Sequence, residues 1–418
     1  MKKILFFTLM LIIATSCKDF LDTTMKSDYS SENFYTSQIA AEKAVTGVYN
    51  SLYGMKWWVF GDVASDDAVK GGNAGDQADI IPISDFTADA DNGIIFNFWQ
   101  DTYETIVQAN YVIKYVPQID MDNNLKNRLI AEVRFIRAFS YFNLINIFGK
   151  VPYKTEPPIN EEAVHVGLSE VSDIYSKIET ELKDIIPTLP TSYPVEKGRV
   201  TRGAAIGLLA KVYLYQKKYS ECLEQIVQLE TLNQYDLVQN YADLFQSGAE
   251  DSIEIIFGLR FINTVETSLG NEYHVWMAPS HEGGWYFNAP TQSFVDAFTE
   301  KTADGEDDFR LDVSIGRDGK PWFNNQTFSS EWSEATGYLV KKYNEEPAVG
   351  FIIAQSTVPY HYLRYADILL MKAEALNEIG SGDVANVAIE LNKIRARAGL
   401  ENTTASTQVA MRNAIRNE

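Results

Sequence analysis

The sequence predicts an all-α fold: a scaffold of paired helices, interrupted by a less regular, loop-rich region before the last helices. Three observations support this prediction. Apolar residues recur at three- and four-residue spacing through much of the chain, which is typical of amphipathic helices. Several of these segments stop at Pro or Gly, which end helices. By contrast, Leu232–Val358 is long and mixed, with four Trp and many Gly.

The sequence of the N-terminal half predicts four helices. In the first, Ala40, Ala44, Val48 and Leu52 recur on one face, as in a helix packed on a core. The next three end where Pro removes a backbone donor or where Gly favours a cap. These helices are Ile39–Tyr53, then Ile94–Val116 before Pro117, Leu125–Phe148 before Gly149, and Leu168–Ile186 before Pro187.

Two further helix pairs carry a possible internal repeat. Small residues recur at matching offsets in the two pairs, and they allow antiparallel helices to approach closely, as in tetratricopeptide-like pairs. Two unrelated helical hairpins are the alternative. In the repeat, Cys222 is a core residue and not a nucleophile. The first pair is Thr201–Lys217 with Ser220–Leu229, and the second is Tyr360–Ile379 with Val384–Ala398. The residues at matching offsets are Ala210, Tyr213, Cys222 and Ile226 in the first pair and Ala373, Leu376, Ala385 and Ile389 in the second. A last helix is expected to begin at Ser406.

Two stretches break the helical pattern. Gly54–Gly93 is rich in Gly, Asp and Asn and contains Trp57-Trp58, while Leu232–Val358 contains one expected short strand within Ile253–Phe261. Because long irregular segments inside a compact protein are usually functional, we expect binding residues there.

The charge balance excludes some partners. The 418 residues hold 36 Lys+Arg and 57 Asp+Glu, for a formal net charge of −21. Such a chain repels phosphate backbones, so we expect no nucleic-acid partner. Cys17 and Cys222 are too few for a disulfide framework or a four-ligand zinc site, and the four His show no metal-binding spacing. We therefore expect no metal and no cofactor.

The first seventeen residues predict an exported lipoprotein. Two Lys precede the apolar run Ile4–Ile13, which is too short to span a bilayer. Small residues then precede Cys17, as in the bacterial lipobox, where that Cys is lipidated after cleavage. Residues 1–16 are therefore predicted to be a signal peptide, with an acyl anchor on Cys17 contributing about 0.8 kcal/mol per buried methylene. The alternative is an ordinary signal peptide that leaves Cys17 as a free thiol.

Four ordered segments resemble the SusD/RagB family of outer-membrane nutrient-binding lipoproteins. The first is the predicted mature start, and the other three lie in predicted helices and the turns beside them. The segments are Cys17–Asp22, Ala131–Phe139 continuing to Phe148–Pro152, Gly198–Ala205 with Leu208–Leu214, and Arg364–Ala375 continuing to Ile394–Gly399.

The resemblance implies several properties of this chain. The fold would be SusD-like: an all-helical scaffold with tetratricopeptide-like pairs and a loop-rich ligand-binding half. Lipid on Cys17 would attach the protein to the outer membrane, facing outward. The partner would be a SusC-like TonB-dependent transporter, and the ligand a glycan or oligosaccharide, occasionally a peptide. The implied division is a signal peptide at 1–16, an N-terminal region at 17–230, a ligand-facing region at 231–357 and a C-terminal helical region at 358–418. Family members usually continue past the segment that ends at Glu418, so the chain is expected to be truncated.

Flat aromatic rings beside short polar side chains suit sugars, because rings match apolar C–H faces while polar groups take hydroxyls. Two loops have this composition. The first offers Trp57, Trp58, Asp66, Asp67, Lys70 and Asn73, with Asp66 and Asp67 carried over from the family; the second offers Trp276, Trp285 and Tyr286.

Less specific explanations exist for each of these residues. Asp66 is also placed to cap a short helix at Ala68. The loop aromatics are also suited to packing on the scaffold. Adjacent residues of a helix point to different faces, so at least one of Trp57 and Trp58 is expected to be partly exposed. Trp322 is a weaker candidate.

Paired carboxylates raise a rival hypothesis, a surface glycoside hydrolase. Such enzymes place two carboxyls about 5–9.5 Å apart across the scissile bond. Asp66-Asp67, Asp307-Asp308 and Glu345-Glu346 are pairs, but 57 acids produce such pairs by chance. Asp307–Arg310 also resembles a structural motif of the family, which implies that Arg310 is an internal partner. We therefore predict that the protein is not an enzyme. A helical-repeat scaffold that binds no ligand is a further alternative.

Overall fold

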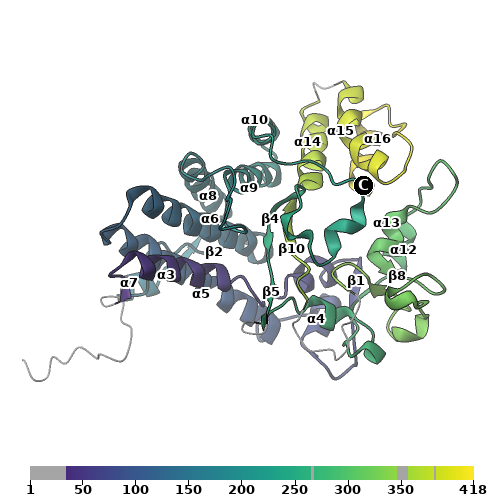
Figure 1. Cartoon of the computed structure of the whole chain (residues 1–418), viewed down its shortest axis with the longest axis horizontal. Helices are drawn as coiled ribbons and strands as arrows, with labels where there is room; N and C mark the ends of the chain where they lie inside the picture. Colours follow the sequence, from purple (N-terminus) through teal and green to yellow (C-terminus); the bar gives the residue numbers. More distant parts are fainter. Residues whose placement is uncertain (1–33, 265–267, 346–355, 381–382) are drawn as a thin grey trace, which may run out of the picture.

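The computed structural model describes residues 34–264, 268–345, 356–380 and 383–418 (Figure 1). The predicted signal peptide and Cys17 lie outside these ranges. Within them, no helix combines the length and the apolar character needed to cross a membrane. Helices dominate, and the predicted all-α class is confirmed.

The four expected N-terminal helices form one side of the molecule (Figure 1). Side-chain oxygens of Ser37, Asn92 and Asp122 accept bonds from backbone N–H groups and begin three of them. Helix α6 packs against both α5 and α8, and most of its second half is buried. The helices are α3 (Gln38–Asn50), α5 (Gly93–Tyr115), α6 (Asn123–Phe148) and α8 (Val171–Ile185).

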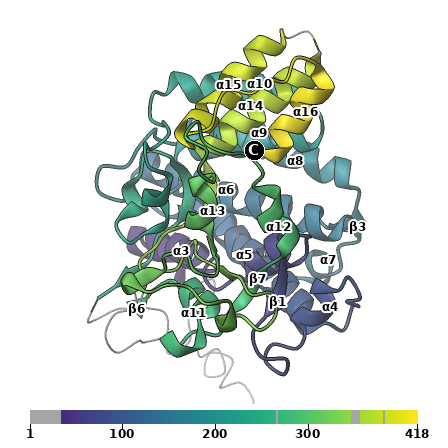
Figure 2. The same cartoon turned by 90° about the vertical axis from the view of Figure 1, so that its right-hand side faces the viewer.

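The two helix pairs stack on each other at the opposite end from the loops (Figure 2). Helix α10 packs against α9 and also against α14, so the first pair covers the second. The last helix, α16, packs on α14 and α15 around buried Met411 and Ile415. The helices are α9 (Arg202–Tyr215), α10 (Tyr219–Thr231), α14 (Tyr365–Ile379), α15 (Val384–Arg397) and α16 (Gln408–Asn417).

The proposed repeat register is wrong in the second pair. Cys222 and Ile226 are fully buried in the first pair, but Ala385 and Ile389 of α15 are exposed. Helix α15 instead packs through Val387, Leu391 and Ile394. Helix α15 begins further along the chain from Ala373 than helix α10 does from Ala210. This shift turns a different face of α15 toward α14. Cys222 is a core residue as predicted, and burial raises its pKa to about 12.

Two expected helix starts are strands. Leu168–Ser169 is β3, paired with β2 (Val151–Pro152). Tyr360–Arg364 is β10, paired antiparallel with β4 (Ile255–Leu259). Strand β4 confirms the strand expected within Ile253–Phe261. In both cases partner strands distant in sequence satisfy the backbone groups of these residues, which periodicity along one segment does not reveal.

The remaining elements are short, as expected for the two irregular stretches. Their strands form two-stranded sheets only, within the described part of the chain. The helical turns are η1 (Val59–Val63), α4 (Ile80–Ser84), η2 (Val116–Gln118), α7 (Glu161–Val164), η3 (Tyr241–Phe245), η4 (Ala249–Asp251), α11 (Tyr273–Met277), η5 (Ser280–Glu282), α12 (Gln292–Ala297), α13 (Phe309–Ser314), η6 (Phe323–Asn325) and η7 (Ser330–Trp332), and the strands are β1 (Ala68–Gly71), β5 (Ile262–Asn263), β6 (Ser268–Leu269), β7 (Phe287–Pro290), β8 (Ile315–Gly316) and β9 (Leu339–Val340).

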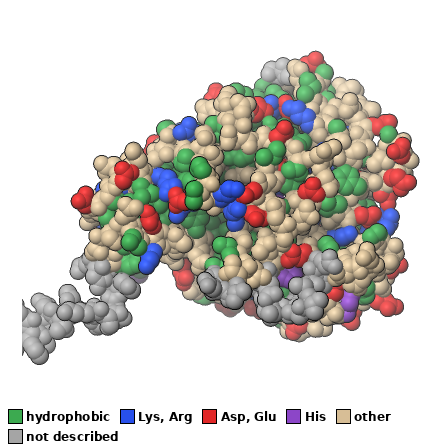
Figure 3. All heavy atoms as spheres, viewed as in Figure 1, with side chains coloured by type: hydrophobic (Ala, Val, Ile, Leu, Met, Phe, Trp, Pro, Cys, Tyr) green, Lys and Arg blue, Asp and Glu red, His purple; other side chains and the backbone are tan. Residues whose placement is uncertain are grey.

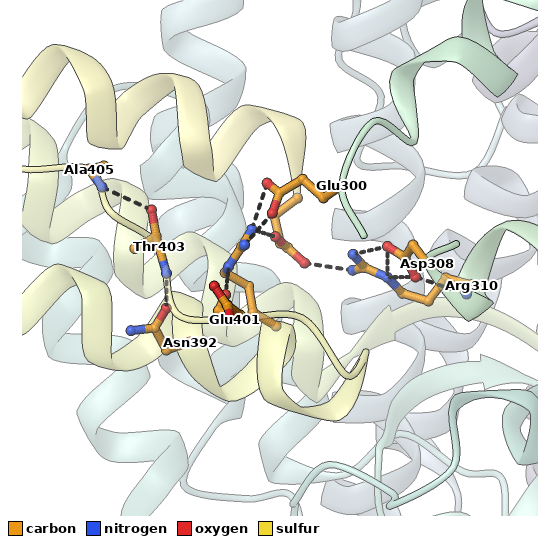
Figure 4. A network of polar contacts seen from close by, with 9 residues as sticks. Glu300, Asp308, Arg310, Asn392, Glu401, Thr403 and Ala405 are labelled. Atoms are coloured by element: carbon orange, nitrogen blue, oxygen red, sulfur yellow. Dashed lines mark hydrogen bonds and ion pairs between the residues drawn. The ribbon is translucent and has the colours of Figure 1, made fainter. Parts of the chain in front are cut away.

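An ionic network ties the C-terminal helices to the loop-rich region (Figure 4). Arg395 of α15 pairs with Glu300 and, at 3.0 Å from Nη1 to Oε2, with Glu418. Glu418 also accepts a hydrogen bond from Arg310 Nη1 at 2.7 Å, and Arg310 donates through Nε and Nη2 to the carboxylate of Asp308. Arg310 is thus an internal partner, as predicted.

Candidate ligand-binding face

Strands β1 and β7 bring the two candidate loops together (Figure 2). They pair antiparallel, with Val69 opposite Ala289 and Gly71 opposite Phe287. The ladder continues beyond the strand, because Gly72 N donates to Tyr286 O at 2.9 Å. At its other end, Thr291 Oγ1 donates to the backbone oxygen of Asp66 at 2.7 Å. Residues more than 200 positions apart in the sequence therefore share one surface.

Trp57 and Trp58 are both buried, at 9% and 3% exposure, so the expectation that one would be exposed is wrong. They do point to different faces. Trp57 packs on Phe98 in the main core, whereas Trp58 packs in a second core, 6.3 Å from the ring of Phe287. Both faces are covered because this segment lies between the two cores. The two residues therefore support the surface from below.

Trp276 and Trp285 continue the row of aromatic rings from buried Trp58 to the surface of the molecule. The Trp276 ring lies 5.9 Å from Trp58 and 4.8 Å, edge to face, from Trp285. Trp276 is half-buried, and Trp285 is 37% exposed. Lys56 Nζ sits 4.8 Å above the Trp276 ring. Among these three tryptophans, the outermost ring is the one free to meet a ligand.

Tyr286 is held in an unusual backbone conformation. Its φ of 43° is uncommon for a bulky residue. Its N–H donates to Ala278 O at 3.0 Å, and its hydroxyl donates to Asn73 Oδ1 at 2.7 Å. Burial, followed by the nearby carboxylates of Glu334 and Asp76, raises the pKa of Tyr286. These contacts fix the ring at the junction of the two loops, a place where strain often accompanies function.

Three carboxylates stand along the β1–β7 ladder, with Asp66 and Asp67 at the end away from Tyr286. Asp66 and Asp67 are exposed, and partial desolvation, helped by Asp66, raises the pKa of Asp67. Asp62 Oδ2 accepts from Asn288 Nδ2 at 2.8 Å. Asp62 retains exposed surface although desolvation raises its pKa. The helix-cap alternative for Asp66 is wrong, because Ala68 begins a strand.

Lys70 is buried at 6% exposure and faces the protein. Its Nζ donates to the backbone oxygens of Gly71, at 3.2 Å, and Asn73, at 2.6 Å. Desolvation lowers the pKa of Lys70. The side chain thus fixes the turn that presents Asn73, whose amide in turn donates to Asp76 Oδ2 at 3.1 Å.

Sequence reasoning missed a second aromatic group beside Tyr286. His281 is exposed, and its ring lies 4.3 Å from half-buried Trp332. Trp322, the weaker candidate, is 5% exposed and donates through Nε1 to Glu282 at 3.2 Å, so it is core. A single Trp in a polar loop carries no periodic signal, which is why Trp332 was not selected.

Two pockets adjoin each other near these rings. One of about 40 Å³ lies beside Trp58 and Trp276, with room for only a few water molecules. The other, of about 250 Å³, shares Lys56 with it and is lined by Phe60 and Phe98. Trp285 lines neither, so a sugar on this ring would lie on the open surface. A larger groove of about 620 Å³ lies elsewhere, between α3 and β4–β5. Among the described side chains, no three His, Cys, Asp or Glu are grouped to hold a metal ion.

Two family models match this chain. One, described as "SusD family", matches residues 253–418, and the other, described as "Starch-binding associating with outer membrane", matches residues 19–214. Together they cover most of the sequence.

Relatives and solved structures agree with the models. SusD-like protein P2 of Formosa agariphila is 25% identical over 94% of this chain and 81% of its own length. SusD-like protein P25 of the same organism is 27% identical over 63% of this chain, which spans about half, 52%, of that relative.

Two solved structures share the fold. A SusD-like carbohydrate-binding protein from Bacteroides fragilis gives a TM-score of 0.81 at 25% identity, covering 92% of this chain and 83% of that one. A laminarin-binding SusD-like protein gives 0.77 at 26% identity, covering 91% and 88%.

Proposed function

Because this chain belongs to the SusD/RagB family, we propose that it is a cell-surface lipoprotein that binds a glycan and passes it to a SusC-like TonB-dependent transporter. Two structural neighbours support glycan as the ligand class, since their names describe carbohydrate and laminarin binding. The observation that carries the proposal for this chain is a ring surface of exposed Trp285 with half-buried Trp276 and Tyr286, at one end of the β1–β7 ladder whose other end carries exposed Asp66 and Asp67.

The proposed binding uses rings for sugar faces and polar groups for sugar hydroxyls. Trp285, the most exposed of the three rings, stacks against the C–H face of a sugar residue. Asp66 and Asp67 accept hydroxyl hydrogen bonds, and Asn73 extends the polar edge. The β1–β7 ladder and the bond from Tyr286 to Asn73 hold these groups in place before the ligand arrives, which reduces the entropy lost on binding.

The proposed attachment is an acyl chain on Cys17, which lies outside the described residues. The description of one matching family model, with its reference to the outer membrane, supports this location. The apolar leader and the small residues before Cys17 support export and lipidation. The SusC-like transporter remains the partner implied by the family.

Outside the candidate face, the described members of the carboxylate pairs are engaged with other side chains, which favours binding over hydrolysis; Asp66-Asp67 is assigned to binding. Asp307 forms ion pairs with Lys301 and Arg317, and Asp308 forms one with Arg310, so neither is placed to act on a sugar. Glu345 accepts from Ser247, and Glu346 lies outside the described residues. We therefore propose no catalytic role.

Calorimetric titration of the mature protein with laminarihexaose, soluble starch and other oligosaccharides tests the proposed function. Trp285→Ala is expected to weaken binding at least tenfold, or about 1.4 kcal/mol, because it removes the stacking ring. Tyr215→Ala is the matched control, since Tyr215 is an aromatic of 52% exposure on α9, away from this surface. Absence of binding by the unaltered protein to every glycan would contradict the proposal, as would equal losses in the two variants.

A further inference from the structure

The pocket of about 250 Å³ lies where the Gly54–Lys56 loop meets the first turns of helix α5. An apolar cavity of about 150 Å³ takes a ring of the size of benzene. The volume of this pocket is therefore sufficient for one sugar ring with its hydroxyls. The pocket adjoins the smaller one beside Trp276, because Lys56 lines both of them.

Buried apolar side chains form part of the pocket lining. The rings of Phe60 and Phe98 have their centroids 4.5 Å apart and are tilted by 52° to each other. Phe60 is half-buried, whereas Phe98 and Ile94 are buried. Trp57 packs edge-on against Phe98 from the main core, with the ring centroids 5.1 Å apart, and holds that ring in place. Such a lining suits the apolar C–H face of a sugar ring.

Three different polar groups line the same pocket. Asn97 and Asp101 are exposed and lie one turn apart on α5, so both side chains are on one face of the helix. No other described residue forms a hydrogen bond with the Asn97 amide or the Asp101 carboxylate. Lys56 adds an ammonium group from the loop. An amide, a carboxylate and an ammonium group together offer donors and acceptors for sugar hydroxyls.

Lys56 connects this pocket with the exposed tryptophan. Its Nζ lies 4.8 Å from the centroid of the Trp276 ring, and the Trp276 ring lies 4.8 Å from that of Trp285. The ammonium group donates to Gln77 Oε1 at 3.0 Å, which leaves donors for a ligand. A short oligosaccharide that stacks on Trp285 and crosses Trp276 therefore reaches the pocket beside Lys56.

The larger groove between α3 and β4–β5 differs in its polar lining. Lys197 and Arg260 both form ion pairs with Asp251. Arg199 forms an ion pair with buried Glu132. Figure 3 shows basic and acidic side chains next to each other near the middle of the molecule. The charged groups of this groove are thus engaged with each other, whereas Asn97 and Asp101 are available to a ligand.

We propose that the pocket between Lys56 and α5 is a second sugar subsite, which takes one residue of the glycan held by Trp285. The proposal rests on the proposed function and adds to it the length of ligand that the site recognises. In this subsite, one sugar face packs on the two phenylalanine rings, while the polar side chains of α5 form hydrogen bonds with hydroxyls. Because both contacts are made by one ligand molecule, the second adds affinity without a second loss of translational freedom.

A series of ligand lengths tests the subsite. Calorimetry with laminaribiose through laminarihexaose, and with malto-oligosaccharides of the same lengths, is expected to show affinity rising by about tenfold at the length that reaches from Trp285 to the pocket. Asn97→Trp places a bulky ring at the pocket, and it is expected to abolish this rise while the shortest oligosaccharide that binds keeps its affinity. Gln100→Trp is the matched control, because Gln100 is exposed nearly one turn further along α5 and does not line the pocket.

A second variant removes the polar groups without adding bulk. Asn97→Ala combined with Asp101→Ala keeps two good helix formers on α5 and is expected to reduce the same rise. A rise that Asn97→Trp and the double variant leave unchanged overturns the subsite but leaves glycan binding at Trp285 intact. The same holds for an affinity that does not depend on chain length, and for equal losses in Asn97→Trp and Gln100→Trp. Absence of binding by every oligosaccharide overturns both proposals.

Discussion

Gly71 and Tyr286 are the residues whose backbone conformations fix the candidate face. Gly71 has a φ of +66°, and a Cβ at this position would lie 2.5 Å from the carbonyl oxygen of Tyr286. The close approach of the two loops therefore requires Gly71 to lack a side chain. The backbone of Tyr286 is also strained, because its φ is positive although its side chain is bulky.

Gly71→Ala is expected to lower the free energy of unfolding by about 1–3 kcal/mol, because the added methyl strains the backbone and clashes with Tyr286. It is also expected to weaken glycan binding, since it moves the β1–β7 junction. Gly75→Ala is the control in the same segment, because a Cβ there meets nothing within 4 Å. Denaturant unfolding of both variants checks the prediction, and equal stabilities would contradict it.

At the single-residue scale, loop composition indicates which aromatic rings reach the surface. The aromatics of the second loop, Trp276, Trp285 and Tyr286, lie on an accessible or half-accessible surface, and their role in ligand binding stays a prediction. The adjacent Trp57 and Trp58 show the limit. Helical geometry sends neighbouring side chains to different faces, but it does not tell whether another element covers each face.

At the scale of elements, a buried ion pair joins α15 to the start of β4. Arg397 Nη1 lies 2.6 Å from Glu254 Oε2, and Glu254 is fully buried. The same oxygen accepts from Val238 N at 2.9 Å. A buried pair of this kind stabilises little relative to an apolar pair, but the loss of one partner leaves an uncompensated charge.

Arg397→Met is expected to cost about 3 kcal/mol of unfolding free energy, because buried Glu254 then keeps only the longer contact with Arg364, 3.8 Å from Nη1 to Oε1, as a cationic partner. Adding Glu254→Gln is expected to recover part of that loss. Lys150→Ala provides the exposed comparison, since its pair with Glu170 is more than half exposed on both sides, and it is expected to cost under about 1 kcal/mol. Strictly additive losses in the double variant would show that the two residues are not coupled.

Helix ends were predictable to within a few residues where Pro, Gly or a capping side chain marks them. Helix α5 ends at Tyr115, with Val116 as its C-cap directly before Pro117, and α6 ends at Phe148, with Gly149 as its C-cap. The first residues of the expected helices at Leu168 and Tyr360 are strands instead, because their partners come from distant segments. The repeat register failed for a related reason: the connection between α14 and α15 sets which face of α15 packs.

At the scale of the whole molecule, the ionic network around Arg395 couples the C-terminal helices to the loop-rich half. Its hydrogen bond to Glu300 holds the pKa of that carboxyl below its ordinary value of 4.5. A carboxyl with a lowered folded pKa contributes stability above its unfolded pKa and loses that contribution as the pH falls through the folded value.

Glu300→Gln is therefore expected to lower the Tm more at pH 7 than at pH 3, because the contribution of the ionised carboxyl is lost progressively as the pH falls below 4.5. Thermal unfolding at the two pH values measures this difference. Glu224→Gln, an exposed change on α10, controls for the loss of charge. An equal Tm deficit at both pH values would show that Glu300 acts through packing and not through its charge.

The approach of the two candidate loops is a property of the whole chain that the sequence did not disclose. Each loop was recognisable by its own composition, but their pairing through β1 and β7 depends on strands of four residues, too short to give a clear pattern. The scaffold was more predictable, since long periodic helices and four family-like segments define it independently.

The position of a bound sugar tests the central claim most directly. A crystal structure of the mature chain with laminarihexaose, or with whichever neutral glycan binds in calorimetry, is expected to show a sugar ring stacked on Trp285 with hydroxyls directed to Asp67 or Asn73. A sugar found instead in the groove between α3 and β4–β5, with Trp285 and Tyr286 untouched, would contradict it.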